Sequence, residues 1–344
     1  MEAILLVGGR GTRLLPLTLK TPKPMLKVAG VPFIAHQISY ARSHGITRII
    51  VAISYKTEQF LDYLGDGSTF GVEIVHAIEN EPMGTGGAIA NASTFLESAN
   101  DEAVAIMNGD VLSAHDISAQ VALHRAQKAD ATLHLTHVAD ARAYGSVPTD
   151  QQGRILAFVE KSDAPPTQFI NAGCYIFQRN VIDQIPKGKV VSVERETFPN
   201  LLAHDARLWG YKSDRYWLDI GTPSALLKAS IDLVTGIFHS PAFLPSPSRL
   251  CIDREAHIAQ GAVINPGSVI GRSQIEDAVA ITESVIGDGV IIERGAQVVR
   301  SIIGDGVFVG AGAHLSGALV AGNGVTVPAN SRQIGEIREN FSSS

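Results

Sequence analysis

Cysteine is scarce in this chain. Only Cys174 and Cys251 occur among its 344 residues. Two separated thiols cannot make a disulfide framework, and they lack the spacing of a metal-binding motif. Such sparse cysteine usage is typical of reducing compartments, so we expect a cytoplasmic protein.

Long apolar runs and a strong excess of positive charge are also missing. No segment approaches the roughly 20 apolar residues of a membrane span, and the N-terminus lacks the basic region and cleavage site of a secretion signal. The net charge is −6 and the pI about 6.0. An acidic balance argues against general affinity for nucleic acid. We therefore expect no membrane and no nucleic-acid partner.

What is present, from Met1 to about Gly236, is an alternation of short apolar runs and helical patterns. The alternation predicts an α/β sheet domain over residues 1–236, whose ligands bind at the carboxyl ends of its strands. Strands are expected at 2–7, 48–54, 72–78, 102–108 and 131–138, and helices at 32–45 and 117–129.

After Gly236 the pattern changes. Residues 237–250 contain the proline- and serine-rich stretch "HSPAFLPSPS" and are predicted to be a linker. Residues 251–332 carry apolar residues near every sixth position and the near-duplicates "VIGDGV" and "IIGDGV". This period predicts a parallel β-helix, and the regular Ile and Val positions argue against a disordered Gly-rich tail. Residues 333–344 are expected to be a loosely held tail.

The stretch "GGRGTRLLPLTLKTPKPM" near the N-terminus combines glycines with fixed positive charge. Glycine allows a ligand to approach the backbone closely, and Arg13 offers a planar fork that suits phosphate oxygens. Pro22 and Pro24 restrict the backbone on both sides of Lys23. The spacing matches neither a P-loop nor a dinucleotide fingerprint. The pattern suits a nucleoside triphosphate; the alternative is a solvated basic loop after an ordinary glycine turn.

Two acidic residues are candidate metal ligands. Asp110, in "NGD", follows the predicted strand 102–108, and Asp219 lies in "WLDIG". Mg²⁺ prefers oxygen ligands and commonly takes one or two protein carboxylates plus phosphates. The alternatives are an ordinary Asn-Gly turn for Asp110 and a helix beginning near Thr222 for Asp219.

The first motif resembles the signature of the nucleotide-sugar pyrophosphorylases, or sugar-1-phosphate nucleotidylyltransferases. The similarity continues through "EPMGTGGAIANA", "NGDVLS", "AYGSVPTD", "FVEK", "INAGCYIF", "VSVERETFP" and "YWLDIGTP". Within the family the chain is most similar to the actinobacterial mannose-1-phosphate guanylyltransferases. The resemblance implies a Rossmann-like nucleotidyltransferase domain with a mixed sheet, followed by a left-handed β-helix.

The resemblance also implies roles for individual residues. Arg13, Lys23 and Asp110 would be catalytic, and Mg²⁺ would be held by Asp110 and Asp219. The nucleotide would be bound by Leu6, Gly8, Gly9, Gly11, Thr12, Arg13, Lys23, Glu81, Gly86, Gly87, Asn108 and Asp110. The sugar phosphate would be bound by Gly145, Glu160, Lys161 and Asn171.

The implied reaction joins GTP and α-D-mannose 1-phosphate to give GDP-mannose and pyrophosphate. The Thr85-Gly86-Gly87 turn departs from relatives that select thymine or uracil, which have a glutamine in this loop. UTP- or dTTP-dependent transfer to another sugar phosphate, such as glucose 1-phosphate, stays open as an alternative. A non-catalytic regulatory paralogue is the second alternative, although Arg13, Lys23, Asp110 and Asp219 are all intact.

Three histidines and the cysteine near Asn171 are expected to be structural or exposed. His134 and His137 should lie on opposite faces of a strand, and His124 should be an exposed helical residue. Cys174 should be a small buried residue and no nucleophile. The β-helix carries few charges, so it is predicted to build a homo-oligomer.

Overall fold

The computed structural model describes residues 1–320 and 324–335, which divide into two compact units. Unit 1 contains Met1–Gly9 and Gln37–Trp217, and unit 2 contains Arg10–His36 and the chain from Leu218 onward. The basic loop near the N-terminus therefore belongs to the same unit as the C-terminal repeats. The predicted domain over residues 1–236 includes this loop, and its limits stay a prediction.

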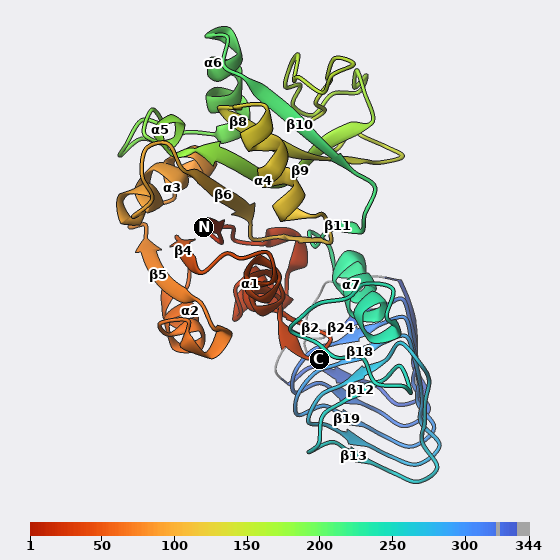
Figure 1. Cartoon of the computed structure of the whole chain (residues 1–344). Helices are drawn as coiled ribbons and strands as arrows, with labels where there is room; N and C mark the ends of the chain where they lie inside the picture. The colour runs from red at the N-terminus through yellow and green to blue at the C-terminus, as the bar shows by residue number, and fades with distance from the viewer. Residues whose placement is uncertain (321–323, 336–344) are drawn as a thin grey trace. The chain divides into compact units, whose positions relative to one another are not determined.

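Unit 1 is built on a seven-stranded sheet of order β10-β8-β9-β6-β1-β4-β5 (Figure 1). β9 runs antiparallel to β6 and β8, and the other neighbours are parallel, so the sheet is mixed as predicted. The strands are β1 (Glu2–Leu6), β4 (Arg48–Ile53), β5 (Glu73–Ile78), β6 (Ala103–Asn108), β8 (Ala131–His137), β9 (Phe169–Gln178) and β10 (Leu208–Ser213).

The helices agree with the amphipathic patterns of the sequence. The two predicted helices are confirmed as α1 and α4, and α4 packs against β8, β9 and β10. The α-helices of the described chain are α1 (Phe33–Ser43), α2 (Thr57–Leu64), α3 (Gly84–Ala92), α4 (Ile117–Ala126), α5 (Arg179–Ile182), α6 (Phe198–Ala203) and α7 (Pro223–Thr235). In the described residues, none of the helices has both the length and the apolar character needed to cross a membrane.

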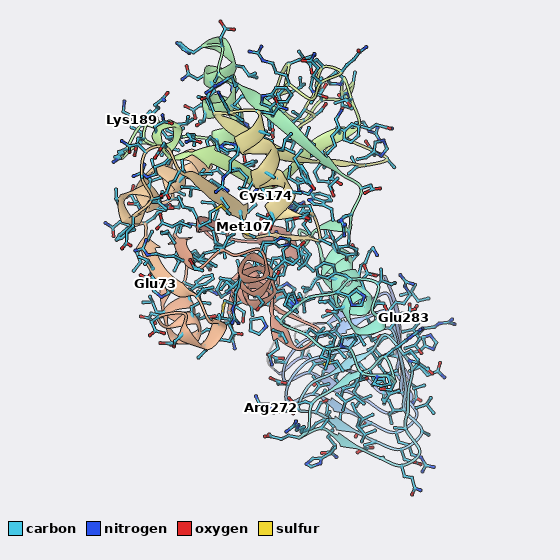
Figure 2. All side chains as sticks on the ribbon, viewed as in Figure 1. Glu73, Met107, Cys174, Lys189, Arg272 and Glu283 are labelled. Carbon is cyan, nitrogen blue, oxygen red and sulfur yellow. The ribbon has the colours of Figure 1, made fainter. Side chains whose placement is uncertain are left out.

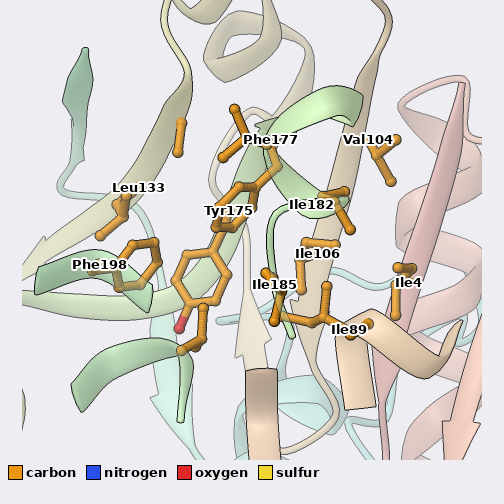
Figure 3. Packing of buried hydrophobic residues seen from close by; sticks show 14 of the residues in the cluster. Ile4, Ile89, Val104, Ile106, Leu133, Tyr175, Phe177, Ile182, Ile185 and Phe198 are labelled. Atoms are coloured by element: carbon orange, nitrogen blue, oxygen red, sulfur yellow. The ribbon is translucent and has the colours of Figure 1, made fainter. Parts of the chain in front are cut away.

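The core of unit 1 lies between the sheet and helices α3, α5 and α6 (Figure 3). Tyr175 and Phe177 of β9 meet Phe198 of α6, and the Phe177 and Phe198 rings stack with centroids 5.8 Å apart. Ile4 and Ile106 continue the cluster onto β1 and β6 with no exposed surface. Aromatic rings contribute large apolar areas to a core of this kind, which gives the strand ends above it a rigid support.

In unit 2 the basic loop is directly followed by a small hairpin, β2 (Lys27–Val28) and β3 (Val31–Pro32). Later in the chain α7 starts after Thr222, whose Oγ1 accepts a hydrogen bond from the Ala225 N–H, as expected of an N-cap. Between α7 and β12, where the linker was predicted, residues 237–250 form neither helix nor named strand.

The rest of unit 2 is a left-handed β-helix made of three five-stranded parallel sheets, drawn from cyan to blue in Figure 1. Gln274, Ile291 and Phe308 are successive partners in one sheet, so these two coils take 17 residues each. Ile275, Ile292 and Val309, one residue further on, have no more than 1% of their surface exposed and fill the interior.

The strands of the β-helix and the remaining short strands complete the fold. The first sheet contains β12 (Cys251–Ile252), β15 (Val269–Ile270), β18 (Val285–Ile286), β21 (Ile302–Ile303) and β24 (Leu319–Val320). The second sheet contains β13 (His257–Ile258), β16 (Gln274–Ile275), β19 (Ile291–Ile292), β22 (Phe308–Val309) and β25 (Thr326–Val327). The third sheet contains β14 (Val263–Ile264), β17 (Ala280–Thr282), β20 (Gln297–Val299), β23 (His314–Ser316) and β26 (Arg332–Ile334). Outside them lie β7 (Val111–Ser113) and β11 (Trp217–Asp219). Of the predicted tail, residues 336–344 lie outside the described chain.

Candidate active site

The centre of the sheet in unit 1 is a topological switch point. β1 lies between β4 and β6, so the chain turns first to one side of β1 and later to the other. Leu6, the last residue of β1, pairs in register with Asn108, the last residue of β6. Ligands of open α/β sheets bind beside such strand ends. The fold thus brings together Leu6, Asn108 and the neighbouring Asp110, as the sequence predicts.

Gly109 explains how the chain places Asp110. Its N–H donates to the Leu6 carbonyl at 2.8 Å. A Cβ at this position would lie 2.3 Å from the same carbonyl oxygen, which belongs to the rigid central strand. Only glycine fits here, so the "NGD" motif has a steric reason beyond an ordinary turn.

The glycines after β1 differ in what they require. A Cβ on Gly8 would lie 2.4 Å from Ser54 Oγ, which donates to the Gly8 carbonyl at 2.8 Å. Gly9 is exposed, and a Cβ there would meet nothing within 4 Å. Of the first three glycines of the motif, Gly11 alone has a positive φ, 62°. Gly8 is needed because the backbone packs closely against Ser54. The open space at Gly9 leaves the backbone accessible, as a nucleotide-binding turn requires.

The second glycine turn packs against a later segment of unit 1. The Gly86 and Gly87 N–H groups, in the first turn of α3, both donate to the Val191 carbonyl. A Cβ on Gly87 would lie 2.5 Å from the Lys189 carbonyl oxygen. These glycines are therefore needed for packing, a role that the sequence analysis did not assign to them. Their contact with the nucleotide stays a prediction.

Thr85 strengthens the same junction. Its Oγ1 donates to Glu194 Oε2 at 2.8 Å and accepts from the Val193 N–H at 2.9 Å. Glu194 lies in a short π-helix, Val193–Thr197, and irregular turns of this kind are frequent at functional sites. Glu81, the other predicted nucleotide contact in this loop, has an exposed side chain.

Three of the four predicted sugar-phosphate residues lie close together in unit 1. The Asn171 N–H donates to the Gly145 carbonyl at 2.9 Å, and a Cβ on Gly145 would lie 3.2 Å from Glu160 Oε2. Lys161 follows Glu160 and is exposed. Arg195 has a guanidinium nitrogen 3.9 Å from Glu160 Oε1, which adds a cation to this cluster.

Tyr175 connects the sugar-phosphate cluster to the end of β6. Its hydroxyl accepts from Asn171 Nδ2 at 2.7 Å and also forms a hydrogen bond with Asn108. Burial, together with the nearby Glu194 charge, raises the pKa of Tyr175 well above its usual value. A neutral phenol therefore orients both amides. Sequence reasoning missed this residue because "CYIF" reads only as an apolar strand.

In unit 2 the basic loop gathers two cations around one carboxylate. Lys23 is 8% exposed, and its Nζ lies 3.7 Å from Asp219 Oδ1. A guanidinium nitrogen of the exposed Arg13 lies 3.9 Å from Asp219 Oδ2. Gly11 packs tightly beneath them, since a Cβ there would be 3.0 Å from the Lys23 Cβ. The cluster carries a net positive charge that suits a polyphosphate.

Gly221 is a functional candidate that the sequence analysis did not single out. A Cβ at this buried position would lie 2.6 Å from a guanidinium nitrogen of Arg13. Glycine lets the planar guanidinium lie directly over the backbone two residues after Asp219. The signal in the sequence was the "DIG" triplet, where a small residue follows the candidate metal ligand.

Two family models match the chain. The nucleotidyl transferase model covers residues 2–236, and the GMPPB C-terminal domain model covers residues 247–334. The chain belongs to the nucleotidyl transferase family. Among curated relatives, a mannose-1-phosphate guanylyltransferase of Mycobacterium tuberculosis is 47% identical over 86% of this chain and 82% of its own length. Mannose-1-phosphate guanylyltransferase 1 of Arabidopsis thaliana is 33% identical over 86% of this chain and 84% of its own length.

Solved structures of related proteins also match this chain. HddC of Yersinia pseudotuberculosis, complexed with GMP-PN, matches this nucleotidyl transferase with a TM-score of 0.58 at 30% identity, over 67% of this chain and 97% of that one. A putative glucose-1-phosphate thymidylyltransferase of Bacillus anthracis has a TM-score of 0.62 over 70% of this chain and 98% of that one. Its 24% identity supports the shared fold alone.

Nucleotidyl transferases typically use a divalent metal, and the donor chemistry here fits Mg²⁺. Asp110 and Asp219 supply hard carboxylate oxygens, and Mg²⁺ is satisfied by one or two such groups when substrate phosphates complete its shell. Within residues 1–320 and 324–335 no cluster of three or more Asp, Glu, His or Cys side chains forms an all-protein cage. The two aspartates lie in different units, so their joint coordination stays a prediction.

The other reactive side chains of this nucleotidyl transferase are structural. Burial raises the pKa of Cys174 to about 12, which confirms a buried thiol rather than a nucleophile. The prediction for His124 was wrong: its ring is 1% exposed and bonds to Thr132 Oγ1 and Gln178 Oε1. His134 is buried and His137 exposed, as their opposite faces on β8 predicted.

His134 makes the stability of the protein sensitive to acid. It stacks on His115 with ring centroids 3.8 Å apart, and burial lowers the pKa of His134 to about 2 and that of His115 to about 4. The unfolded chain takes up both protons near pH 6.5. Below that pH the unfolded state therefore binds more protons, and stability falls as the pH decreases toward 4.

We expect His134→Leu to flatten this pH dependence. Each histidine contributes a slope of up to about 1.4 kcal/mol per pH unit between pH 6 and 4. The free energy of unfolding, measured with urea from pH 7.5 to 4.5, reports the slope. His137→Leu, on the exposed face of the same strand, is the matched control and should keep the wild-type slope. Equal slopes for wild type and His134→Leu would contradict the prediction.

Proposed function

We propose that the protein is a mannose-1-phosphate guanylyltransferase, which joins GTP and α-D-mannose 1-phosphate to give GDP-mannose and pyrophosphate. The observation that carries the proposal is the cluster in which the buried Lys23 and the exposed Arg13, both in the loop after a glycine turn, lie near Asp219 of β11. The relative from M. tuberculosis, which bears this name and matches over most of both chains, supports the choice of substrates.

The reaction needs charge neutralisation and orientation more than covalent catalysis. A phosphate oxygen of the sugar phosphate attacks the α-phosphorus of GTP, a new P–O bond forms, and the bond to the β-phosphate oxygen breaks in line. Lys23, held in a fixed buried position, stabilises the charge that grows on the α-phosphate. Arg13 binds the departing pyrophosphate, and Lys161 binds the incoming sugar phosphate. Asp110 and Asp219 would hold Mg²⁺, which would further neutralise the phosphate oxygens.

The sugar and base are selected in unit 1. Asn171, oriented by the Gly145 carbonyl and the Tyr175 hydroxyl, would bind sugar hydroxyls together with Glu160. The base would lie beside Leu6, Glu81 and the Gly86-Gly87 turn. The GMP-PN complex of HddC supports guanine for a relative of this fold. UTP- or dTTP-dependent transfer to another sugar phosphate is the alternative that the sequence left open.

The proposal is tested by pyrophosphate release over a grid of nucleoside triphosphates and sugar 1-phosphates. We expect the highest kcat/KM with GTP and mannose 1-phosphate. A preference for UTP or dTTP would replace the substrate assignment and keep the enzyme class. No release with any pair, from a folded protein with Mg²⁺, would identify a non-catalytic regulatory paralogue.

Replacing Asp219 by asparagine tests the metal assignment. The amide keeps the shape of the side chain but loses the charge that a hard cation prefers. We expect Asp219→Asn to raise the Mg²⁺ concentration for half-maximal rate about tenfold or more. Asp214→Asn, a charge loss at an exposed position nearby in the chain, should leave the Mg²⁺ dependence unchanged. The same Mg²⁺ dependence in both variants would remove Asp219 from the ligand set.

The C-terminal domain is proposed to assemble the protein into a homo-oligomer. Val263 and Ile291, on two of the β-helix sheets, have 54% and 37% of their surface exposed, and apolar surface of this kind favours association. Light scattering on the full chain should give a mass above that of one chain, and a monomer would refute the assembly.

The proposed domain limits stay at 1–236, 237–250, 251–332 and 333–344. The two free thiols fit the proposed cytoplasmic location.

A further inference from the structure

The hairpin β2–β3 is the continuation of the basic loop. The Leu26 N–H donates to the Lys23 carbonyl at 3.1 Å, and the Leu26 carbonyl accepts from the Phe33 N–H at 2.9 Å. Ala29 and Gly30 form its two-residue turn with φ of 50° and 79°, the pattern of a tight hairpin. Lys23 is therefore only four positions before the first residue of a stiff element, and a shift of the hairpin moves it.

The turn of this hairpin is fastened by residues from the C-terminal part of unit 2. The Ala29 N–H donates to Ser230 Oγ of α7 at 3.2 Å, and the Ala29 carbonyl accepts from Cys251 Sγ at 3.4 Å. Ser230 is fully buried. Both polar groups of the turn residue thus have partners more than 200 positions later in the sequence.

His36 adds a third point of attachment. Its Nε2 lies 3.1 Å from the Val28 carbonyl oxygen, and its Nδ1 lies 2.7 Å from Ser240 Oγ. The ring is 1% exposed, and burial lowers the pKa of His36. A neutral imidazole donates through one nitrogen and accepts through the other, so it joins the hairpin to the segment after α7.

The β-helix itself reaches the hairpin through Asp288. Lys27 Nζ donates to Asp288 Oδ2 at 2.7 Å, while Asp288 Oδ1 accepts from the Arg272 N–H at 3.1 Å. Arg272 lies on the outside of the β-helix (Figure 2). Partial burial alone would raise the pKa of Asp288, but the hydrogen bonds from Lys27 and Arg272 lower it overall. The carboxylate is charged at neutral pH and is held by the Arg272 N–H of the preceding coil.

From these four attachments we propose that the β-helix positions Lys23 for catalysis, and that Asp288 is its positioning residue. The proposal rests on the catalytic role of Lys23 given above. The β-helix then acts on the reaction through the Lys27–Asp288 pair and the hairpin, without touching substrate. Because misplacing a reacting group by about 1 Å can cost on the order of 10²-fold in rate, even a partial release of the hairpin is measurable.

The duplicated "GDG" turns supply a matched pair of variants. Asp305 occupies the position of Asp288 one coil later and accepts from the Asp288 N–H at 2.7 Å. Asp288→Asn and Asp305→Asn each remove one charge and keep an oxygen for the backbone N–H. Only the first removes the carboxylate that pairs with Lys27. Lys27→Met and the double variant Lys27→Met/Asp288→Asn complete a double-mutant cycle, which measures the coupling between the two side chains.

The experiment measures kcat and KM for both substrates and the hydrogen exchange of residues 11–33 in the full-length protein without substrate. We expect Asp288→Asn to lower kcat about three- to tenfold with KM within twofold, and to speed exchange in residues 24–30. Lys27→Met should give a similar loss, and the double variant should be no worse than either. Asp305→Asn should leave kcat within twofold and exchange unchanged.

Unchanged exchange in Asp288→Asn, or equal effects of Asp288→Asn and Asp305→Asn, would overturn the positioning role. Additive losses in the double variant would do the same, because they would mean that the two residues act separately. A wild-type protein without nucleotidyl transfer would instead overturn the proposed function, and the exchange data alone would then decide whether Asp288 anchors the hairpin.

Discussion

Lys23→Met should lower the turnover of nucleotidyl transfer by on the order of 10²–10³, since this is the cost of removing one fixed charge contact from a reacting phosphate. Lys23 is nearly buried, and its Nζ lies 3.7 Å from Asp219 Oδ1. Methionine keeps the length of the apolar stem that packs beside Gly11, so the loop keeps its shape. The loss therefore measures the charge alone.

The measurement is kcat from pyrophosphate release, accompanied by the thermal unfolding midpoint. Lys20→Met, an equal change at an exposed position in the same loop, is the matched control and should stay within a few-fold of wild type. Activity of Lys23→Met within that same range would show that Lys23 does not stabilise the transition state.

Asp110→Asn should have a loss of similar size, on the order of 10²-fold or more in kcat. The Gly109 N–H fixes the backbone of this turn on the Leu6 carbonyl, so the carboxylate has a defined place at the switch point. Asparagine keeps the volume and one oxygen but has no charge to hold a hard cation beside the phosphates.

A Mg²⁺ titration of this variant separates two causes of the loss. If Asp110 binds metal, higher Mg²⁺ should restore part of the rate. Asp116→Asn provides the control, because Asp116 caps α4 through the Ala119 N–H and an amide oxygen can replace that contact. A near-normal rate for Asp110→Asn at low Mg²⁺ would exclude it as a ligand.

The strands and repeats were predictable from the sequence because their signal is local. β1, β4, β5, β6 and β8 each lie within the predicted runs, and the period of Ile and Val identified the β-helix. Gly45, the last residue of the predicted helix 32–45, has a φ of 80°. The period of apolar residues and the position of glycines at turns can be read from short stretches of sequence, so these features are predictable without knowing the distant contacts.

The sequence patterns did not predict structural features that depend on contacts with distant residues. The surroundings of His124 come from Thr132 and Gln178 on neighbouring strands, which a helical pattern does not reveal. The constraints on Gly109 and Gly221 are contacts with the Leu6 carbonyl and the Arg13 guanidinium, which the sequence alone does not reveal. The grouping of residues 10–36 with the C-terminal chain was likewise hidden, since it follows from tertiary contacts alone.

The attachment of the hairpin to Ser230, 201 positions later, also constrains how the chain is made. Synthesis proceeds at roughly 5–20 residues per second, so the turn at Ala29 is exposed for roughly 10–40 s before its partner has been translated. The first strand of the sheet can meanwhile pair with β4 and β6, which are complete early. The loop that bears Lys23 is thus among the first segments synthesised and among the last to reach its native place, so a ribosome-bound or prematurely terminated chain has a sheet without a working basic loop.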